Sequence, residues 1–332
     1  RRFIDEYEVS PARAQLCMMT TRETLRAAAS LSPKDICLYV GIPFCPTRCA
    51  YCSFVSQSVE KSMKLIPPFL EALEKEIAAT AAQINALGLR VVSVYMGGGT
   101  PTTLSAQQLD RLCTVLEDEF DLGAVREYTV EAGRPDTIST DKLRVLRAHG
   151  VDRVSVNPQT MSDRVLELIG RRHTAADIER ALMLVREAGG FDVNMDLIAG
   201  LPGDSAEGFR DTVEKVLALG AENITVHTLT MKRASNLVIK NEEHSYDDVA
   251  QMIEKNKILA DYGYAPYYMY RQKSTVKNLE NVGFSQLGHE SLYNIYIMEE
   301  VQTIISCGAG GVSKVNAAMA AEILCLKYGV DL

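Results

Sequence analysis

The stretch ICLYVGIPFCPTRCAYC, residues 36 to 52, joins a β-branched strand candidate to three cysteines that fall within eight positions. This strand candidate (36–42) is the first of six, and the others lie at 90–97, 126–132, 152–157, 191–200 and 223–229. Amphipathic helical stretches lie between them, and six strand-then-helix units in succession indicate a parallel sheet. Because a full barrel needs eight units, we predict an α/β fold built as an open or partial (β/α)6 barrel, with a doubly wound sheet as the alternative.

The repeating pattern of strand and helix ends after Thr230. The rest of the chain consists of a tyrosine-rich segment, a turn-like segment (278–290), a strand candidate (293–300), a glycine cluster and a helical tail (315–329). We therefore expect three parts. They are a helical N-terminal lead-in (1–34), the barrel (35–231) and a smaller α+β C-terminal appendage (232–332) that closes one side of the barrel.

The composition narrows the class of partner. A formal charge of -8 and a pI near 5.3 argue against a nucleic-acid surface, because nucleic-acid-binding proteins usually carry a basic patch. No apolar run is long enough to cross a bilayer, and the N-terminus shows no signal-peptide core. We expect a cytoplasmic protein with a small-molecule partner, whose eight cysteines are free thiols or metal ligands rather than disulfides.

The three cysteines of the opening stretch, Cys45, Cys49 and Cys52, form a C-x3-C-x2-C motif at the C-terminal end of the first strand candidate. In β/α barrels that end carries the active site. A structural zinc site would need a fourth ligand, and the nearest downstream histidine is the distant His149. An iron–sulfur cluster suits thiolates at these spacings, and a four-iron cluster held by three of them keeps one iron open to another ligand.

Polar or glycine-rich sequences also come after the later strands. The segment YMGGGTPTT (95–103) matches neither a dinucleotide fingerprint nor a P-loop, and it indicates either a tight turn or a ligand that approaches the backbone closely. Polar residues recur at the same ends of the next strands, which favours one shared polar pocket. They are Glu131, Asn157 with Gln159, Asp196 and His227.

Together these motifs resemble the radical S-adenosylmethionine (SAM) superfamily. The segments YVGIPFC (39–45), GGGTPT (97–102), RVSVNPQTM (153–161), LIGRRHT (168–174) and DLIAGLPGD (196–204) are similar to the oxygen-independent coproporphyrinogen III oxidase (dehydrogenase) family. The later phrase YYMYRQKSTVKNLENVGF (267–284) resembles its HemZ-type subgroup.

The resemblance implies a radical SAM type partial barrel with two cofactors, a [4Fe–4S] cluster and SAM. Cys45, Cys49 and Cys52 would bind the cluster, whose fourth iron would chelate the amino and carboxylate groups of SAM. Tyr39 and Tyr51, near the cluster and adenine, are the expected catalytic residues. The expected SAM-binding residues are Gly98 and Gly99 near the methionine amino group, Glu131 and Arg171 at the ribose or carboxylate, and Gln159 and Asp196 at the ribose hydroxyls, together with Thr100.

The resemblance also implies a reaction, the oxidative decarboxylation of coproporphyrinogen III to protoporphyrinogen IX through a 5′-deoxyadenosyl radical. A low-potential donor of the flavodoxin or ferredoxin type would reduce the cluster. The appendage would cover the tetrapyrrole. For this role we expect stacking by Tyr262, Tyr264, Tyr267, Tyr268 and Tyr270, and propionate binding by Lys232, Arg233 or Arg271, although ordinary core packing is the alternative for the tyrosines.

The sequence departs from the family pattern at two points. Ser53 and Phe54 come after Cys52 where decarboxylating relatives often have another cysteine, and Asn157-Pro158 replaces a glycine-centred turn. The first departure is shared with haem-carrying and methyl-transferring relatives. Three functions therefore stay open: the decarboxylation, another radical reaction on a tetrapyrrole such as haem opening or methylation, and a non-catalytic haem chaperone.

Overall fold

A computed structural model describes residues 2–52, 57–230, 249–255, 257–270, 275 and 279–316. All six predicted strands form, each followed by at least one helix. They are β1 (Asp35–Ile42), β4 (Arg90–Gly98), β5 (Glu127–Glu131), β6 (Arg153–Ser155), β7 (Asp192–Ala199) and β8 (Asn223–Thr228). These strands pair in parallel and in this order, and the described edge strands of their sheet do not pair with each other, so the barrel is partial as predicted.

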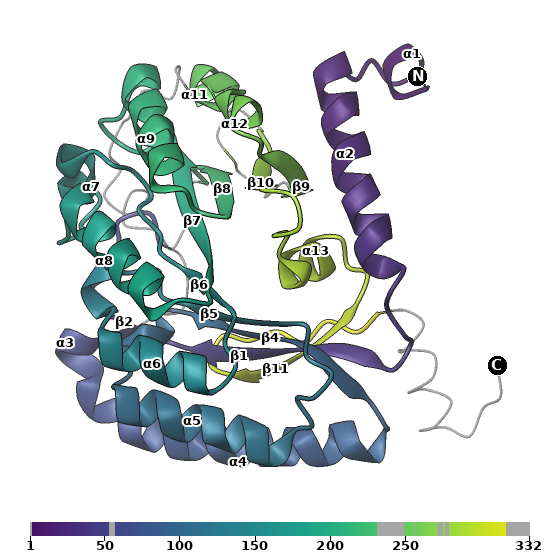
Figure 1. Cartoon of the computed structure of the whole chain (residues 1–332), viewed down its shortest axis with the longest axis vertical. Helices are drawn as coiled ribbons and strands as arrows, with labels where there is room; N and C mark the ends of the chain where they lie inside the picture. Colours follow the sequence, from purple (N-terminus) through teal and green to yellow (C-terminus); the bar gives the residue numbers. More distant parts are fainter. Residues whose placement is uncertain are drawn as a thin grey trace.

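The predicted helices of the barrel also form, and Figure 1 shows most of them on the outer face of the curved sheet. They are α4 (Ile66–Ala86), α5 (Ala106–Glu119), α6 (Thr140–Ala148), α7 (Asp163–Leu168), α8 (Ala175–Ala188) and α9 (Ala206–Leu219). Local signals set their ends. Ser105 forms a capping box with Gln108 at the start of α5, and Gly220 ends α9 in the left-handed conformation.

Further elements complete the N-terminal half and the loops. The lead-in holds α1 (Arg2–Asp5) and α2 (Pro11–Ala28), and α2 packs along the open side of the sheet (Figure 1). The cysteine region contributes β2 (Phe44–Cys45), β3 (Gln57–Ser58), α3 (Val59–Ser62) and the 3-10 turn η1 (Met63–Leu65). Two further 3-10 turns, η2 (Pro101–Thr103) and η3 (Pro135–Thr137), come after β4 and β5.

The C-terminal region extends the barrel sheet at both edges. Strand β10 (Asn281–Ser285) pairs antiparallel with β8, and β9 (Ala265–Tyr270) pairs with β10. Strand β11 (Thr303–Gly308) lies parallel to β1 at the opposite edge. The short helices α11 (Val249–Lys255) and α12 (Ile258–Asp261) precede β9. Strands from the predicted third part thus share the sheet of the second part. The division of the chain into three parts stays a prediction.

Two predictions for this region are wrong. The segment predicted as turn-like (278–290) contains β10, and the strand predicted over 293–300 is instead helix α13 (Leu292–Met298). The alternating tyrosines and isoleucines suit a strand locally. A helix forms because its first backbone N–H groups find acceptors, one of them the side chain of Ser291 and another a carboxylate from β5.

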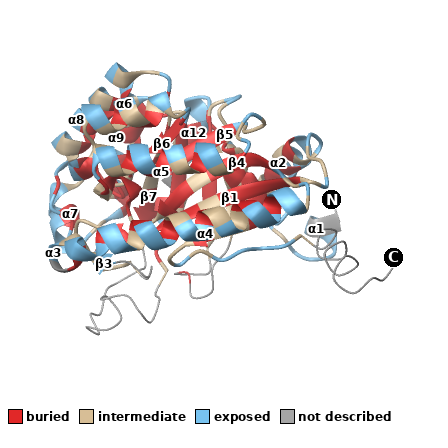
Figure 2. Cartoon of the chain, turned by 90° about the horizontal axis from the view of Figure 1, so that it is seen from below, coloured by how far each residue is buried: buried red, intermediate tan, exposed pale blue. Residues whose placement is uncertain are grey.

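Successive side chains of β1 point to opposite faces of the sheet and so belong to two separate apolar layers. Leu38 and Val40 face the helices in the main core, whereas Cys37 and Tyr39 face α13 on the concave side. Figure 2, seen from below, shows the mostly buried strands behind helices α4 and α5, whose outward faces are exposed. The concave side therefore belongs to a separate cluster of tyrosines, and this is the side that carries the site.

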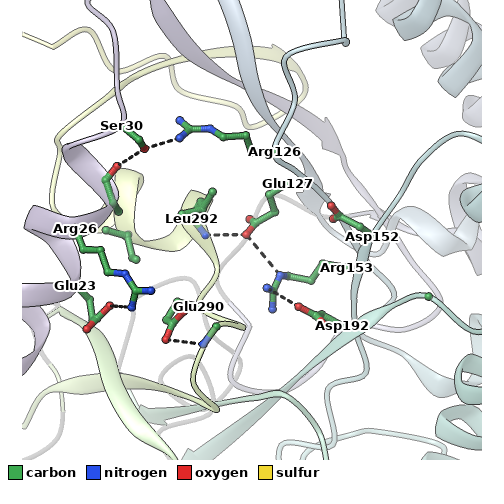
Figure 3. A pocket seen from close by; sticks show the side chains of 14 residues that line it. Glu23, Arg26, Ser30, Arg126, Glu127, Asp152, Arg153, Asp192, Glu290 and Leu292 are labelled. Atoms are coloured by element: carbon green, nitrogen blue, oxygen red, sulfur yellow. Dashed lines mark hydrogen bonds and ion pairs between the residues drawn. The ribbon is translucent and has the colours of Figure 1, made fainter.

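Helix α13 is held in place by Glu127, the first residue of β5 (Figure 3). Its carboxylate accepts hydrogen bonds from the Ser291 hydroxyl (2.9 Å) and from the backbone N–H groups of Leu292 (2.7 Å) and Tyr293 (3.2 Å). The buried guanidinium of Arg153 lies beside it, with Nε 3.5 Å from Glu127 Oε2. A negative charge at a helix N-terminus satisfies donors that the helix itself cannot.

We expect Glu127→Gln to lower the free energy of unfolding by about 2 kcal/mol, because the amide loses the charge-assisted share of three buried hydrogen bonds and removes one of the two carboxylates, Glu127 and Asp192, that pair with Arg153. Urea denaturation of the two proteins measures this difference. Glu23→Gln is the matched control, since Glu23 on α2 lines one cavity together with Glu127 but is a half-buried carboxylate paired with the exposed Arg26. Equal effects of the two substitutions would contradict the anchoring role of Glu127.

Candidate functional site

A cavity of about 530 Å³ lies at the end where the parallel strands finish. Its volume falls in the usual range for small-molecule sites. All twelve predicted site residues line it: Tyr39, Cys45, Cys49, Tyr51, Cys52, Gly98, Gly99, Thr100, Glu131, Gln159, Arg171 and Asp196. Asn157 and His227, the other polar residues predicted at strand ends, line it too. The structure thus brings the predicted residues together, while their individual roles stay proposals.

The cysteine loop is tied to the barrel by backbone hydrogen bonds on both sides. Ala50 N–H donates to Ile169 O (2.9 Å), and Gln57 N–H donates to Pro43 O (2.7 Å). Within the loop, Cys52 N–H donates to Cys49 O (3.1 Å). The Thr100 hydroxyl lies 3.5 Å from Cys45 Sγ and donates to it. The described part of the loop, up to Cys52, is therefore held by these hydrogen bonds, and its three cysteines line one cavity.

Three thiols along the wall of one cavity suit the separate corners of a polynuclear cluster. Within the described ranges, no three His, Cys, Asp or Glu side chains converge as ligands of one metal ion. A cubane distributes its thiolates over separate iron corners, so its ligands line a wall rather than meet at a point. The zinc alternative needs four converging ligands, which the described residues do not supply.

The glycine stretch after β4 allows a close backbone approach. Gly99 N–H donates to Ile42 O (2.7 Å), and Thr100 N–H donates to Phe44 O (2.8 Å). A Cβ atom on Gly99 would stand 2.6 Å from Phe44 O, so only glycine fits. Gly98 adopts φ +104°, which side-chain-bearing residues rarely adopt. The glycines thus allow the start of the cysteine loop to pack against the end of β4. The sequence alone did not show this reason for having glycine at these positions.

Glu131 is the acidic group nearest the glycine stretch. Its carboxylate accepts a hydrogen bond from the Tyr95 hydroxyl at 2.6 Å, and the Gly98 backbone also donates to it. Burial raises the pKa of Glu131 from 4.5 to about 7, although the hydrogen bond from Tyr95 opposes the rise. Near neutral pH this carboxyl therefore exists in both protonation states.

This raised pKa predicts a pH-dependent stability. Between about pH 4.5 and 7 the folded state binds the Glu131 proton that the unfolded state has released, so stability falls as pH rises through that window. We expect Glu131→Gln to match the wild type near pH 5 and to be more stable by on the order of 1–3 kcal/mol above pH 7. Urea denaturation of the metal-free protein at several pH values tests this, and a difference independent of pH would contradict it.

Arg171 connects three loops at the cavity wall. Its Nη1 donates to Asn157 O (2.6 Å) and Gly133 O (3.3 Å), and its Nη2 donates to the Tyr51 hydroxyl (3.2 Å). Burial alone would lower the pKa of Arg171, but neighbouring Tyr51 and Cys49 raise it above its usual value. Asn157, where the sequence departs from the family, thus supplies a backbone acceptor for this cation.

Asp196 stands at the centre of a polar network from β7 and β8. It accepts from Asn194 Nδ2 (2.8 Å) and lies 3.6 Å from His227 Nε2, while Tyr270 Oη lies 3.1 Å from His227 Nδ1. Burial would raise the pKa of Asp196, but these hydrogen bonds hold it below its usual value. Gln159, next to Asp196, adopts a left-handed φ of +67°. Such a strained backbone is a frequent feature of functional sites.

An aromatic wall that sequence reasoning missed faces this network. Tyr95 stacks on Tyr293 with ring centroids 4.3 Å apart, and Tyr39 lies 6.1 Å from Tyr95. Tyr95 lies on β4 and Tyr293 on α13. Because the segment of α13 was predicted as a strand, the sequence did not indicate that these two rings stack. The alternation in RVVSVYMG, which places Tyr95 on the same face as Ser93, was the one available signal.

Of the five appendage tyrosines predicted to stack on a substrate, two line the cavity, Tyr268 and Tyr270. Tyr264 and Tyr267 are instead buried in the core, and Tyr262 is exposed. The predicted propionate-binding residues Lys232, Arg233 and Arg271, as well as Ser53 and Phe54, lie outside the described residues. Arg48 and Lys314 are cationic residues on the cavity wall that sequence reasoning did not select.

The cavity wall also carries buried polar atoms without a hydrogen-bond partner among the described residues. They are Ser155 Oγ, Arg171 Nε, Tyr293 Oη and Ser306 Oγ. Buried polar groups are normally paired, so these atoms mark positions where a polar ligand would bind. Together with the thiols, they fit a cluster and a polar small molecule held in one cavity.

The fold and site define a partial α/β barrel with a thiol-lined cavity at its mouth. The chain belongs to the radical SAM superfamily, whose family model matches residues 39–216. Its cofactors are those of the superfamily, a [4Fe–4S] cluster and SAM.

Among known proteins, the chain is 43% identical to the oxygen-independent coproporphyrinogen-III oxidase-like protein HemZ of Bacillus subtilis, over 84% of this chain and 57% of HemZ. The chain thus spans little more than half the length of that relative. It is 31% identical to the heme chaperone HemW of the same organism, over 89% of this chain and 75% of HemW. The structure of coproporphyrinogen III oxidase (HemN) from Escherichia coli superposes with a TM-score of 0.71 and 25% identity, covering 88% of this chain and 67% of HemN.

None of the helices in the described ranges combines the length and apolar character needed for a bilayer crossing.

Proposed function

We propose that the chain catalyses the oxygen-independent oxidative decarboxylation of coproporphyrinogen III to protoporphyrinogen IX. The observation that carries this proposal is the single cavity, which joins the three thiols to the polar strand ends and to the tyrosine wall. The similarity to HemZ over 84% of the chain supports it. In this superfamily the cluster and SAM together supply a one-electron oxidant strong enough to remove hydrogen atoms from carbon.

In this proposal each predicted residue has a role that its surroundings support. Cys45, Cys49 and Cys52 bind the cluster. Tyr39 and Tyr51 line the space beside it, where their rings exclude water from the reacting atoms. The remaining residues orient SAM: Gly98, Gly99 and Thr100 at its amino end, Glu131 and Arg171 at the carboxylate or ribose, and Gln159 and Asp196 at the ribose hydroxyls.

The wall opposite the cysteines is the proposed tetrapyrrole side. The half-buried Tyr270 offers aromatic surface to a flat macrocycle, and the buried Tyr268 stacks on it with the two ring planes 9° apart. Lys314, which also pairs with Glu300, lines the same cavity and carries positive charge that suits a propionate group. Arg48, in the cysteine loop itself, brings a second positive charge to the cavity. Each decarboxylated propionate would lose carbon dioxide and two hydrogen atoms to become a vinyl group. One would leave as a hydrogen atom to the SAM-derived radical, and the other would leave as a proton while its electron passes to an acceptor.

The test is mass spectrometry of an anaerobic reaction. The protein is reconstituted with iron and sulfide, then supplied with dithionite, SAM and coproporphyrinogen III. We expect products that have lost carbon dioxide and two hydrogen atoms from one propionate and then from two. We expect no such products from Cys52→Ala. Cleavage of SAM without loss of carbon dioxide would overturn the proposal, and products that gain a methyl group or lose iron from haem would select the alternative tetrapyrrole reactions.

A second candidate is haem binding without turnover, favoured by His227 and by the similarity to HemW. The imidazole of His227 lines the cavity with its side chain 27% exposed, and imidazole is a common axial ligand of haem iron. It ranks second because His227 would have to release Asp196 or Tyr270. A Soret band on haem titration that shifts in His227→Ala, with no 5′-deoxyadenosine formed from SAM, would select it.

A further inference from the structure

One wall of the cluster site carries a cation that the SAM-binding roles do not use. Arg134, in the loop after β5, has a buried side chain that is 3% exposed. Its Nη1 donates toward Cys49 Sγ at 3.9 Å and to Thr47 Oγ1, in the same loop, at 3.0 Å. Arg134 thus contacts both a proposed cluster ligand and the loop that presents it.

The orientation of this guanidinium is set by Asp136. Nε of Arg134 lies 3.1 Å from Oδ1 of Asp136, and Nη2 lies 3.3 Å from Oδ2. A two-pronged pair of this kind fixes the plane of the guanidinium, which leaves Nη1 for the cysteine loop. Asp136 itself is 37% exposed, so solvent weakens its compensation of the buried positive charge.

A buried N–H donor and positive charge beside a ligand sulfur have a definite effect on a cluster. Reduction adds one negative charge, which the donor and the cation stabilise more than they stabilise the oxidised form. We propose that Arg134 is a positioning residue that raises the reduction potential of the cluster through its contact with Cys49. The inference depends on the proposed ligation by Cys49, and it holds whichever substrate the protein uses.

The experiment measures the midpoint potential of the reconstituted full chain, without substrate, by redox titration followed by electron paramagnetic resonance. We expect Arg134→Gln to shift the equilibrium toward the oxidised cluster about tenfold, a potential lower by about 59 mV for a one-electron couple. Arg134→Lys keeps the positive charge but loses the planar guanidinium that pairs with Asp136. The reduction potential of the cluster should therefore fall less in this variant than in Arg134→Gln. Asp136→Asn is the matched control, because it removes a negative neighbour of Arg134 and should leave the potential unchanged or higher.

Unchanged potentials in both Arg134 variants, at equal iron content, would overturn the inference. An equal fall of the potential in Asp136→Asn would also overturn the inference. That result would indicate that the geometry of the loop, rather than the charge of Arg134, sets the potential. If Arg134→Gln assembles no cluster, Arg134→Lys and Asp136→Asn decide. A lower potential in Arg134→Lys alone supports the inference, and equal potentials in the two variants overturn it. A wild type with a normal cluster but no decarboxylated product would refute the proposed function and leave this inference intact.

Discussion

Cys49→Ala should abolish the cluster, so that the reconstituted protein loses its brown visible absorbance and nearly all of its iron. The remaining pair of thiolates cannot hold three corners of a cubane. Cys49 is the most enclosed of the three, 8% exposed and approached by Arg134 and Arg171. Its loss therefore also leaves two buried cations without the thiolate they face.

The matched control is Cys17→Ala, which removes a cysteine of α2 that does not line the cavity. We expect this variant to keep the iron content and absorbance of the wild type. Iron and sulfide analysis with visible spectroscopy under anaerobic conditions makes the comparison. A colourless wild type containing one zinc per chain would contradict the cluster itself, and a brown Cys49→Ala protein would contradict the ligand assignment.

Gly99→Ala should destabilise the protein by about 3 kcal/mol and sharply reduce cluster assembly. The new Cβ would stand 2.6 Å from Phe44 O and 2.9 Å from Ile42 O, which are backbone atoms that cannot rotate away. The end of β4 must then separate from the segment before Cys45, which weakens the two hydrogen bonds that join them. Overpacking costs about 1–3 kcal/mol, and the weakened hydrogen bonds add about 1 kcal/mol.

Gly123→Ala tests whether this effect is local. A Cβ on Gly123 meets only the carboxylate of Asp121, an exposed side chain that can rotate. We expect this control to change the free energy of unfolding by less than about 1 kcal/mol and to keep its iron. Urea denaturation of the metal-free proteins and iron analysis of the reconstituted ones give the two readouts. Wild-type behaviour of Gly99→Ala would show that β4 and the cysteine loop do not depend on this contact.

The parallel part of the fold was predictable from the sequence because its signals are local. Each strand is a short apolar run, each helix has its own periodicity, and end signals such as Ser105 and Gly220 act within one turn. Parallel strands end at one edge, so residues at those ends had to lie near one another. The predicted set from Tyr39 to Asp196 came from this rule and from the family resemblance, and it shares one cavity.

The C-terminal region instead depends on contacts between distant segments of the folded chain. The segment 293–300 is a helix because the carboxylate of Glu127, far away in the sequence, accepts from its first N–H groups. Likewise, the strand over 281–285 exists because β8 offers it an edge to pair with. Contacts with distant partners carry no periodicity or end signal that a single sequence displays.

The same division applies to the site. Residue types and their spacing were enough to establish which groups gather at the barrel mouth and which chemistry their thiols support. Folding decided that Tyr95 and Tyr293 stack, that Glu131 has a pKa of about 7, and that Arg134 approaches Cys49. These properties arise from burial and from side chains of different elements meeting at short range. They are set by packing in three dimensions, which residue order alone does not specify.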